Sequence, residues 1–428
     1  MATISFYRDP SSILGFVQGS EYALSMARSS PMTYMAQYHA GTMEILHALR
    51  GELAQIGALS SRAAEVIRGG GRVWTSMHSG HLPRFETHQE RRGNPGLIVQ
   101  HDDFAVLEPG DMVFTNFCHR EVLAARRRGV YVVCVTTPYR DNEFRPTGFT
   151  DLSHGNPDGL MLGDVSDEVL HTHMPYQQGL VDCAEIPEFT LCPCAATGTG
   201  AVHWMLVGEV EQKLADPDAP EGGKARQYLE VLTERAGRTA AHMDAIEETA
   251  LTMAERILAG GRWFARSLEH PGLQTEFQEA SGPRVVNYGD WDAAPDQNIM
   301  LISAISPAFP EEVALAREKR EQGAFVIAIG PAALDGVVPE EGLGRIADVA
   351  FDNFSPESGG AVEIAGRAQT ICPTSAIVDN VIQQMISAQW AEEMIGKGTV
   401  PTFLRGVYQT GGAAYNSAMT ERFAERGY

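Results

Sequence analysis

The sequence contains an internal repeat, and this repeat constrains the fold more than any other feature. Short motifs recur in the same order at an offset of 190 residues, with small changes of offset in the loops. The matched positions are Gln37-Tyr38 with Gln227-Tyr228, Ile56 with Ile246, Gly70-Gly71-Arg72 with Gly260-Gly261-Arg262, residues 127–135 with 321–329, and Cys192-Pro193 with Cys372-Pro373. Loops tolerate insertions better than helices or strands do. We therefore interpret the chain as two copies of one domain.

Each copy reads as helices followed by alternating strands and helices. In the first copy, apolar residues recur at helical spacing over 32–69, and glycines then precede a strand that opens at Arg72. A short buried strand over 112–114, a helix over 121–128 and a strand over 130–136 come next. Strand, helix and strand at this spacing are typical of a parallel α/β sheet.

Composition places the boundary between the copies at residues 216–223, DPDAPEGG, which read as a linker. We predict an N-terminal arm over 1–30 and a first domain over 31–215. The linker over 216–223 then leads into a second domain over 224–428, which ends in a C-terminal arm.

Charge and hydropathy exclude several classes of partner. The formal net charge of −22 argues against nucleic acid or an anionic membrane, because both need a positive surface. No apolar run approaches the roughly 18 residues of a membrane helix, and the first residues lack the pattern of a secretory signal. Six cysteines are too few for a disulfide scaffold, so we expect reduced thiols and a cytoplasmic protein.

The stretch Arg72–Arg91 carries the densest set of candidate catalytic groups. Its strand runs into the loop His78-Ser79-Gly80-His81, and a predicted helix holding Glu86 follows. Glycine lets a ligand approach the backbone closely, and the helix start offers free N–H groups to an anion. Histidine titrates near neutrality, so two histidines beside a glutamate can serve in proton transfer. The alternative interpretation is a polar surface loop with scattered histidines.

The order of elements resembles that of the sugar isomerase (SIS) domain, which binds phosphosugars. The resemblance is closest to a branch whose first loop reads Gly-His-Ser-His, with a glutamate five residues after the second histidine. His78-Ser79-Gly80-His81 and Glu86 match that spacing with glycine and serine interchanged. Ile302-Ser303-Ala304-Ile305-Ser306 approximates the family's phosphate loop, and Cys372-Pro373-Thr374-Ser375 its Pro-Thr-Ser turn. The resemblance implies two tandem copies of a three-layer αβα domain, each with a five-stranded parallel sheet.

The two copies lack different parts of the family pattern. At the second-strand loop, the first copy reads TNFCHR over 115–120, without the paired serines. At the first loop, the second copy reads RSLEHP over 266–271, without the two histidines. We hypothesise that the halves form an internal pseudo-dimer with composite, unequal sites. The other explanation is independent drift, with one inactive copy retained for packing.

The resemblance implies isomerisation of a sugar or sugar phosphate between its aldose and ketose forms, by proton transfer at C1–C2. A carboxylate suits the carbon-bound proton and a histidine suits the proton on oxygen. The predicted catalytic groups are therefore Glu86 as base, His81 as its partner, and His78. The predicted ligand-binding hydroxyls are those of Ser79, Ser267, Ser303, Ser306, Thr374 and Ser375. Turns and helix caps use the same residue types, which is the alternative role for these hydroxyls.

Other functions use the same residues. His78 and His81 with Glu86 or His88 could hold zinc, whereas the prediction adopted is that no cofactor is needed. A deglycase or deaminase of an aminated sugar phosphate would share the enolisation step. The non-enzymatic alternative is a regulatory protein that binds a sugar phosphate without turnover. We also expect a homo-oligomer, because sites in the SIS family tend to lie at interfaces.

Overall fold

The computed structural model describes residues 32–428, apart from 78–80, 117, 119, 137–158, 178, 269, 271–272, 275, 277–281, 285–293, 335, 357–359 and 408. Of His81, only the backbone is described. The predicted N-terminal arm lies outside the described residues. Residues Thr33–Tyr428 form one compact unit, so both predicted domains belong to the same body.

The first half of the chain builds a parallel sheet of five strands in the order β2-β1-β3-β4-β5. The strands are β1 (Val73–Ser76), β2 (Val99–Gln100), β3 (Met112–Thr115), β4 (Tyr131–Val135) and β5 (Glu168–Leu170). Every residue of β3 is buried, which explains why this strand reads as a continuous apolar run in the sequence.

The second half builds a parallel sheet in the order β12-β11-β10-β8, with four strands in the residues that the structure describes. The strands are β8 (Trp263–Arg266), β10 (Ile299–Ser303), β11 (Phe325–Gly330) and β12 (Val349–Asp352). The prediction of an α/β chain with two parallel sheets is confirmed. Two short antiparallel pairs were not predicted: β6 (Gly179–Val181) with β7 (Leu191–Pro193), and β9 (Gly282–Pro283) with β13 (Phe403–Leu404).

The helices follow the same order in both halves. Those of the first half are α1 (Tyr34–Ala48), η2 (Leu49–Glu52), α2 (Leu53–Arg68), α3 (His81–Glu86), η3 (Phe104–Val106), α4 (Arg120–Arg127), α5 (Leu162–Val165) and α6 (Ala195–Ala215). Those of the second half are α7 (Gly223–Arg238), η4 (Thr239–His242), α8 (Met243–Leu258), α10 (Pro310–Glu321), α11 (Leu343–Ile346), α12 (Ser375–Gly396) and α13 (Gly412–Arg426).

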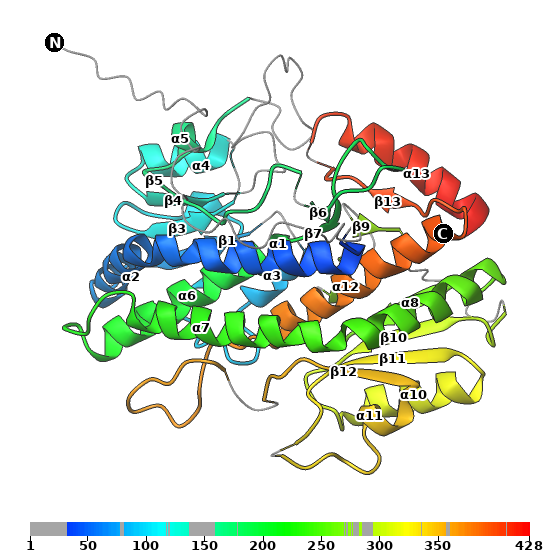
Figure 1. The fold of residues 1–428 in the computed structure, drawn as a ribbon. Helices are drawn as coiled ribbons and strands as arrows, with labels where there is room; N and C mark the ends of the chain where they lie inside the picture. Colours follow the sequence, from blue (N-terminus) through cyan, green and yellow to red (C-terminus); the bar gives the residue numbers. More distant parts are fainter. Residues whose placement is uncertain are drawn as a thin grey trace, which may run out of the picture. The chain divides into compact units, whose positions relative to one another are not determined.

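The first helix of each half packs on the long helix of the other half. Helix α1 lies against α12, and α7 lies against α6, while α2 packs on α6 and α8 packs on α12 within their own halves. These helices can be followed by label in Figure 1. Helices α6 and α12 are buried over most of their length, because other helices cover them.

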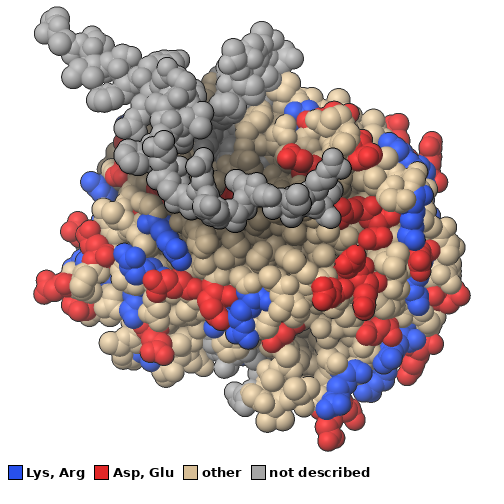
Figure 2. Space-filling view, in the orientation of Figure 1, with Lys and Arg blue, Asp and Glu red and all other residues tan. Residues whose placement is uncertain are grey.

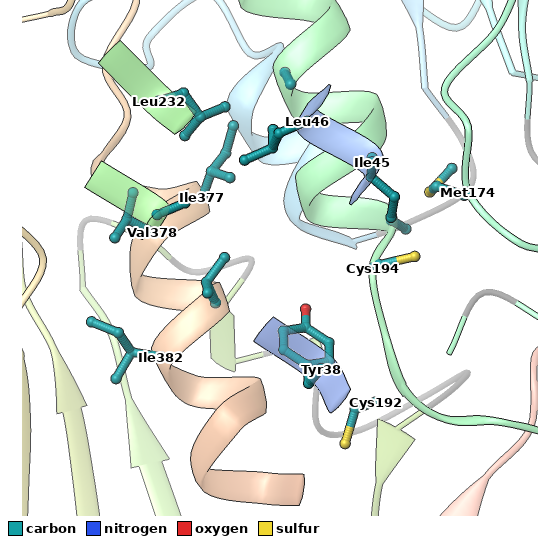
Figure 3. Packing of buried hydrophobic residues seen from close by; sticks show 14 of the residues in the cluster. Tyr38, Ile45, Leu46, Met174, Cys192, Cys194, Leu232, Ile377, Val378 and Ile382 are labelled. Atoms are coloured by element: carbon teal, nitrogen blue, oxygen red, sulfur yellow. The ribbon is translucent and has the colours of Figure 1, made fainter. Parts of the chain in front are cut away.

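One hydrophobic core joins the two halves, and its details repeat. Tyr38 of α1 and Ile377 of α12 belong to the same cluster, part of which is drawn in Figure 3. The hydroxyl of Tyr38 donates to the carbonyl of Pro193 at 3.2 Å, and that of Tyr228 donates to the carbonyl of Pro373 at 3.2 Å. The residues before these prolines, Cys192 and Cys372, both have a φ of 61°. The structural repeat therefore follows the sequence repeat down to single contacts.

The surface and the thiols agree with the composition. Figure 2 shows acidic side chains spread over the drawn face, with basic ones interspersed rather than gathered into a single patch. None of the six cysteines, all of which are described, forms a disulfide. Among the described helices, none combines the length and apolar character needed to cross a membrane.

Candidate functional site

The structure places four of the predicted site residues on three elements. Glu86 ends α3, Ser303 ends β10, and Thr374 and Ser375 form the N-terminal boundary of α12. The prediction for His78 and Ser79 concerns residues outside the described part of the chain, and the side chain of His81 is not described either. The described hydroxyls and Glu86 can therefore be examined in detail.

Glu86 is buried and both of its carboxylate oxygens are occupied. Its side chain is 2% exposed, and Oε1 accepts a hydrogen bond from Arg91 Nε at 2.6 Å. Oε2 accepts from the indole Nε1–H of Trp204 in α6 at 3.0 Å. The hydrogen bond from Arg91 is charge-assisted, and such bonds are stronger than hydrogen bonds between neutral groups. The predicted base thus forms a buried ion pair with an arginine that the sequence had not singled out.

Arg91 joins the two halves of the chain. Its Nη2 lies 3.3 Å from Nε2 of His270 and 3.4 Å from Oγ of Ser375, both in the second half. An arginine can only donate, so Nε2 of His270 accepts, and the proton of a neutral imidazole then sits on Nδ1. The same Nε2 lies 3.3 Å from Oγ of Ser375. Histidine, serine and arginine thereby meet at a single point.

Asp379 holds His270 from the other side. Nδ1 of His270 lies 3.2 Å from Oδ2 of Asp379, within the distance of an ion pair. The angle of this contact does not meet that of a hydrogen bond. Oδ2 of Asp379 accepts from Oγ of Ser303 at 2.8 Å, and Oδ1 accepts from Nδ2 of Asn353 at 2.7 Å. The side chains of His270 and Asp379 are fully buried. The carboxylate is therefore fixed by two hydrogen bonds as well as by the imidazole.

A second arm of the network reaches Thr374. Its Oγ1 accepts from Nη1 of Arg235 at 2.6 Å and lies 2.9 Å from Oγ of Ser355. The backbone N–H of Ser355 donates to Oδ1 of Asn353 at 2.9 Å, which connects this arm to Asp379. Burial lowers the pKa of Arg235. Arg235 is thus the second arginine, besides Arg91, at the start of α12.

Two predicted hydroxyls serve the backbone. Oγ of Ser267 accepts from the N–H of His270 at 3.2 Å, so Ser267 shapes the loop that presents the imidazole. Oγ of Ser306 accepts from the N–H of Ala308 at 3.3 Å in the turn before α10. The structure thus brings Glu86, Ser303, Thr374 and Ser375 into one network, attaches Ser267 to it through His270, and leaves Ser306 in a local turn.

A small pocket opens beside the network. Arg91, Arg92 and Ser375 line it, and its volume is about 80 Å³. One water molecule takes about 30 Å³ in the liquid, so the pocket has room for a tetrahedral anion. Gly93, which also lines the pocket, has a φ of 84°, and a Cβ there would lie 2.9 Å from Cδ of Pro373. Only glycine permits this close approach of the two halves.

The corresponding corner of the first half is apolar. The sequence repeat places three core residues at the positions that Arg235, Ser355 and Thr374 occupy in the second half. These residues, labelled in Figure 3, are Ile45, Met174 and Cys194. In the described residues, the start of α6 thus lacks the polar arm that surrounds the start of α12. At this corner the two halves are therefore unequal.

Several groups of this network, among them Arg91, His270 and Asp379, were not predicted from the sequence. Arg91 lies inside the stretch that was singled out, but as one charged residue among several. His270 stands in the loop over 266–271, which lacks the pair of histidines found in the corresponding loop of the first half, and Asp379 interrupts an apolar helical run, which is the one signal that could have identified it. Among the described residues, no cluster of three or more His, Cys, Asp or Glu side chains is placed to hold a metal.

No protein-family model matches the chain. Among curated proteins, UPF0309 proteins of Brucella canis and Brucella melitensis are each 28% identical over 133 residues, which covers 31% of this chain and 54% of theirs. The chain thus spans about half the length of the curated relatives that it matches.

Similar solved structures extend over more of the chain. The C-terminal domain of glucosamine-fructose-6-phosphate aminotransferase from Francisella tularensis matches with a TM-score of 0.49 and 11% identity, covering 87% of this chain and 99% of that one. Tagatose-6-phosphate ketose/aldose isomerase from Escherichia coli matches with a TM-score of 0.45 and 12% identity, covering 86% and 94%. These are proteins to which the chain is similar.

Proposed function

We propose that this protein binds a phosphorylated sugar at the start of α12 and interconverts its aldose and ketose forms. The observation that carries the proposal is the position of Arg91. This arginine of the first half contacts both His270 and Ser375 of the second half, at the wall of a pocket. The first half of the chain thereby supplies a cation, and the second half supplies a hydroxyl and an imidazole.

Phosphate binding is supported by the chemistry of the pocket wall. Helix α12 has 22 residues, and its first N–H groups and dipole favour an anion at its start. Arg92 lines the pocket and is exposed to solvent, so its charge is available to a ligand. Arg91 and Ser375 add a guanidinium and a hydroxyl. With a net charge of −22, the protein needs such a local site to hold an anionic substrate.

Proton transfer is supported by the arrangement around His270. The one lone pair of its Nε2 faces both Arg91 and Ser375, so Nε2 takes a proton only when it gives up the bond from Arg91. Asp379 stabilises the imidazolium that then forms. We propose that His270 and Ser375 move the proton in isomerisation, removing it from the carbon next to the carbonyl and returning it to the carbonyl carbon, while the proton of the neighbouring hydroxyl passes to the carbonyl oxygen. Glu86 takes the role of charge partner to Arg91, because both of its oxygens are already occupied.

The proposal is tested by proton NMR in heavy water with pairs of five- and six-carbon aldose and ketose phosphates. We expect deuterium to enter at C2 of one pair with the wild-type chain and the exchange to fall at least about a hundredfold in His270→Gln, within the range for loss of an acid-base group. Ser306→Ala is the matched control, since its hydroxyl serves only a turn. Absence of exchange and of binding for every pair would overturn the proposal.

A regulatory protein that binds a sugar phosphate without turnover is the second candidate. The observation that favours it is the ion pair of Glu86 with Arg91, which withdraws the carboxylate that the sequence offered as base. The same experiment separates the two functions: thermal stabilisation by a sugar phosphate, without exchange at C2, assigns the regulatory role. In either case both halves of one chain complete the pocket, so we propose that the expected homo-oligomer is not needed to assemble it.

A further inference from the structure

A second pocket lies at the carboxyl ends of the strands in the second sheet. It has a volume of about 260 Å³, and its walls come from the ends of β10, β11 and β12, with Leu343 and Gly344 of α11. In open parallel sheets, the crevice outside the carboxyl ends of the strands is where ligands bind. None of the residues that line it takes part in the network around Arg91 and His270. The two pockets are therefore separate.

Small side chains line this pocket and make its walls mostly apolar. Ala304, Ala328, Ile329 and Gly330 lie at the ends of β10 and β11. Gly330 has no room for a side chain, because a Cβ there would lie 2.5 Å from the carbonyl oxygen of Ala304. The exposed side chain of Val338 lies at the rim. Such walls suit a planar ring rather than a charged or branched ligand.

The polar groups of the pocket are hydrogen-bond acceptors. Nε2 of His242 lies 2.8 Å from the carbonyl oxygen of Asp352, which can only accept, so Nε2 donates and Nδ1 of the neutral ring is an acceptor. Oδ1 of Asp352 accepts from the N–H groups of Ala332 and Phe354. Within the described residues, Nδ1 of His242 and Oδ2 of Asp352 have no hydrogen-bond partner. Both residues line the pocket.

The ring of His242 is held in place. It stacks on the ring of Phe354 with a centroid distance of 5.3 Å and an interplanar angle of 3°. The guanidinium of Arg238 lies 4.0 Å from the centroid of the same Phe354 ring. A fixed aromatic acceptor beside an apolar slot fits a flat ligand that carries an N–H donor. We propose that this pocket binds a planar heteroaromatic ring bearing an amino group, of the aminopurine type.

The probe is adenine, with purine as the analogue that lacks the amino group. We expect saturation-transfer NMR and calorimetry to show adenine binding to the full chain, and purine to bind about tenfold more weakly, as the loss of one good hydrogen bond predicts. The test uses no sugar phosphate, so its outcome is independent of the function proposed for the other pocket.

A filled pocket provides the decisive variant. Gly344 lines the pocket, and a Cβ at this position meets no atom within 4 Å, so the backbone has room for a side chain here and Gly344→Phe adds a ring to the pocket wall. Gly163 is the matched control, because it is also the second residue of a four-residue helix, α5, and is also open to a Cβ. We expect Gly344→Phe to weaken adenine binding at least about tenfold, while Gly163→Phe binds as the wild type does. Failure of adenine to bind the wild type at millimolar concentration, or equal binding by both variants, overturns the proposal.

Discussion

Replacing Glu86 with glutamine distinguishes a structural ion pair from a free catalytic base. The side chains of Arg91 and Glu86 are 6% and 2% exposed, so neither charge can turn to water when its partner is removed. In Glu86→Gln, the guanidinium of Arg91 stays buried without a counter-ion, while the amide oxygen can still accept a hydrogen bond.

The expected cost follows from this burial. Removing one partner of a buried pair destabilises a protein by about 3–5 kcal/mol, because the remaining charge is uncompensated. Arg91→Gln leaves a buried carboxylate and should cost a similar amount. The double variant Glu86→Gln/Arg91→Gln removes both charges together, so its cost should fall below the sum of the single costs by about 3 kcal/mol.

Urea unfolding at pH 7, followed by circular dichroism, measures these free energies of unfolding. The wild type, both single variants and the double variant complete the cycle. A loss of less than about 1 kcal/mol in Glu86→Gln, the cost typical of an exposed pair, together with complete loss of deuterium exchange, would refute the reasoning and return Glu86 to the role of catalytic base.

Three further predictions test other parts of the structure. Ser375→Ala should raise the dissociation constant of a bound sugar phosphate about tenfold by calorimetry, with Ser306→Ala unchanged as the control. Burial lowers the pKa of His203 to about 3, whereas a histidine in the unfolded chain titrates at about 6.5. Between these two pH values the unfolded chain binds more protons than the folded chain, which favours unfolding. The contribution of His203 to the free energy of unfolding is therefore present at pH 7, and about 2 kcal/mol of it is lost by pH 5. Urea unfolding of His203→Gln at both values should lack that loss, and an unchanged pH dependence would contradict the assignment. Protein purified without chelator should lose no activity on dialysis against EDTA, and loss restored by zinc would support the alternative of a zinc site at His78 and His81.

Local pattern was sufficient to predict most of the fold. Parallel strands covered on both faces appear as short apolar runs, so the strand predicted over 130–136 agrees with β4, Tyr131–Val135. The helix predicted over 121–128 agrees with α4, Arg120–Arg127, because Gly129 ends it. The antiparallel pair of β9 with β13 joins residues more than a hundred positions apart, and no periodicity reports such pairing.

The site was predicted only where its residues belong to short motifs. Glu86, Ser303 and Ser375 could be identified in this way. Arg91 and His270 acquire their importance from a contact between halves, at positions 179 apart in the sequence. Sequence spacing carries no information on such a contact. The acceptor state of His270 Nε2 likewise depends on its neighbour in space, so it could only be derived from the structure.

The exchange of first helices between the halves has a consequence for how this chain folds and can be divided. Since α1 completes the packing around α12 and α7 completes that around α6, neither half has a finished interior of its own. Unfolding should then be cooperative across both sheets, with a single transition. If the linker over 216–223 were cut, we expect the two polypeptides to remain an obligate heterodimer, and the composite pocket would exist only in that assembled form.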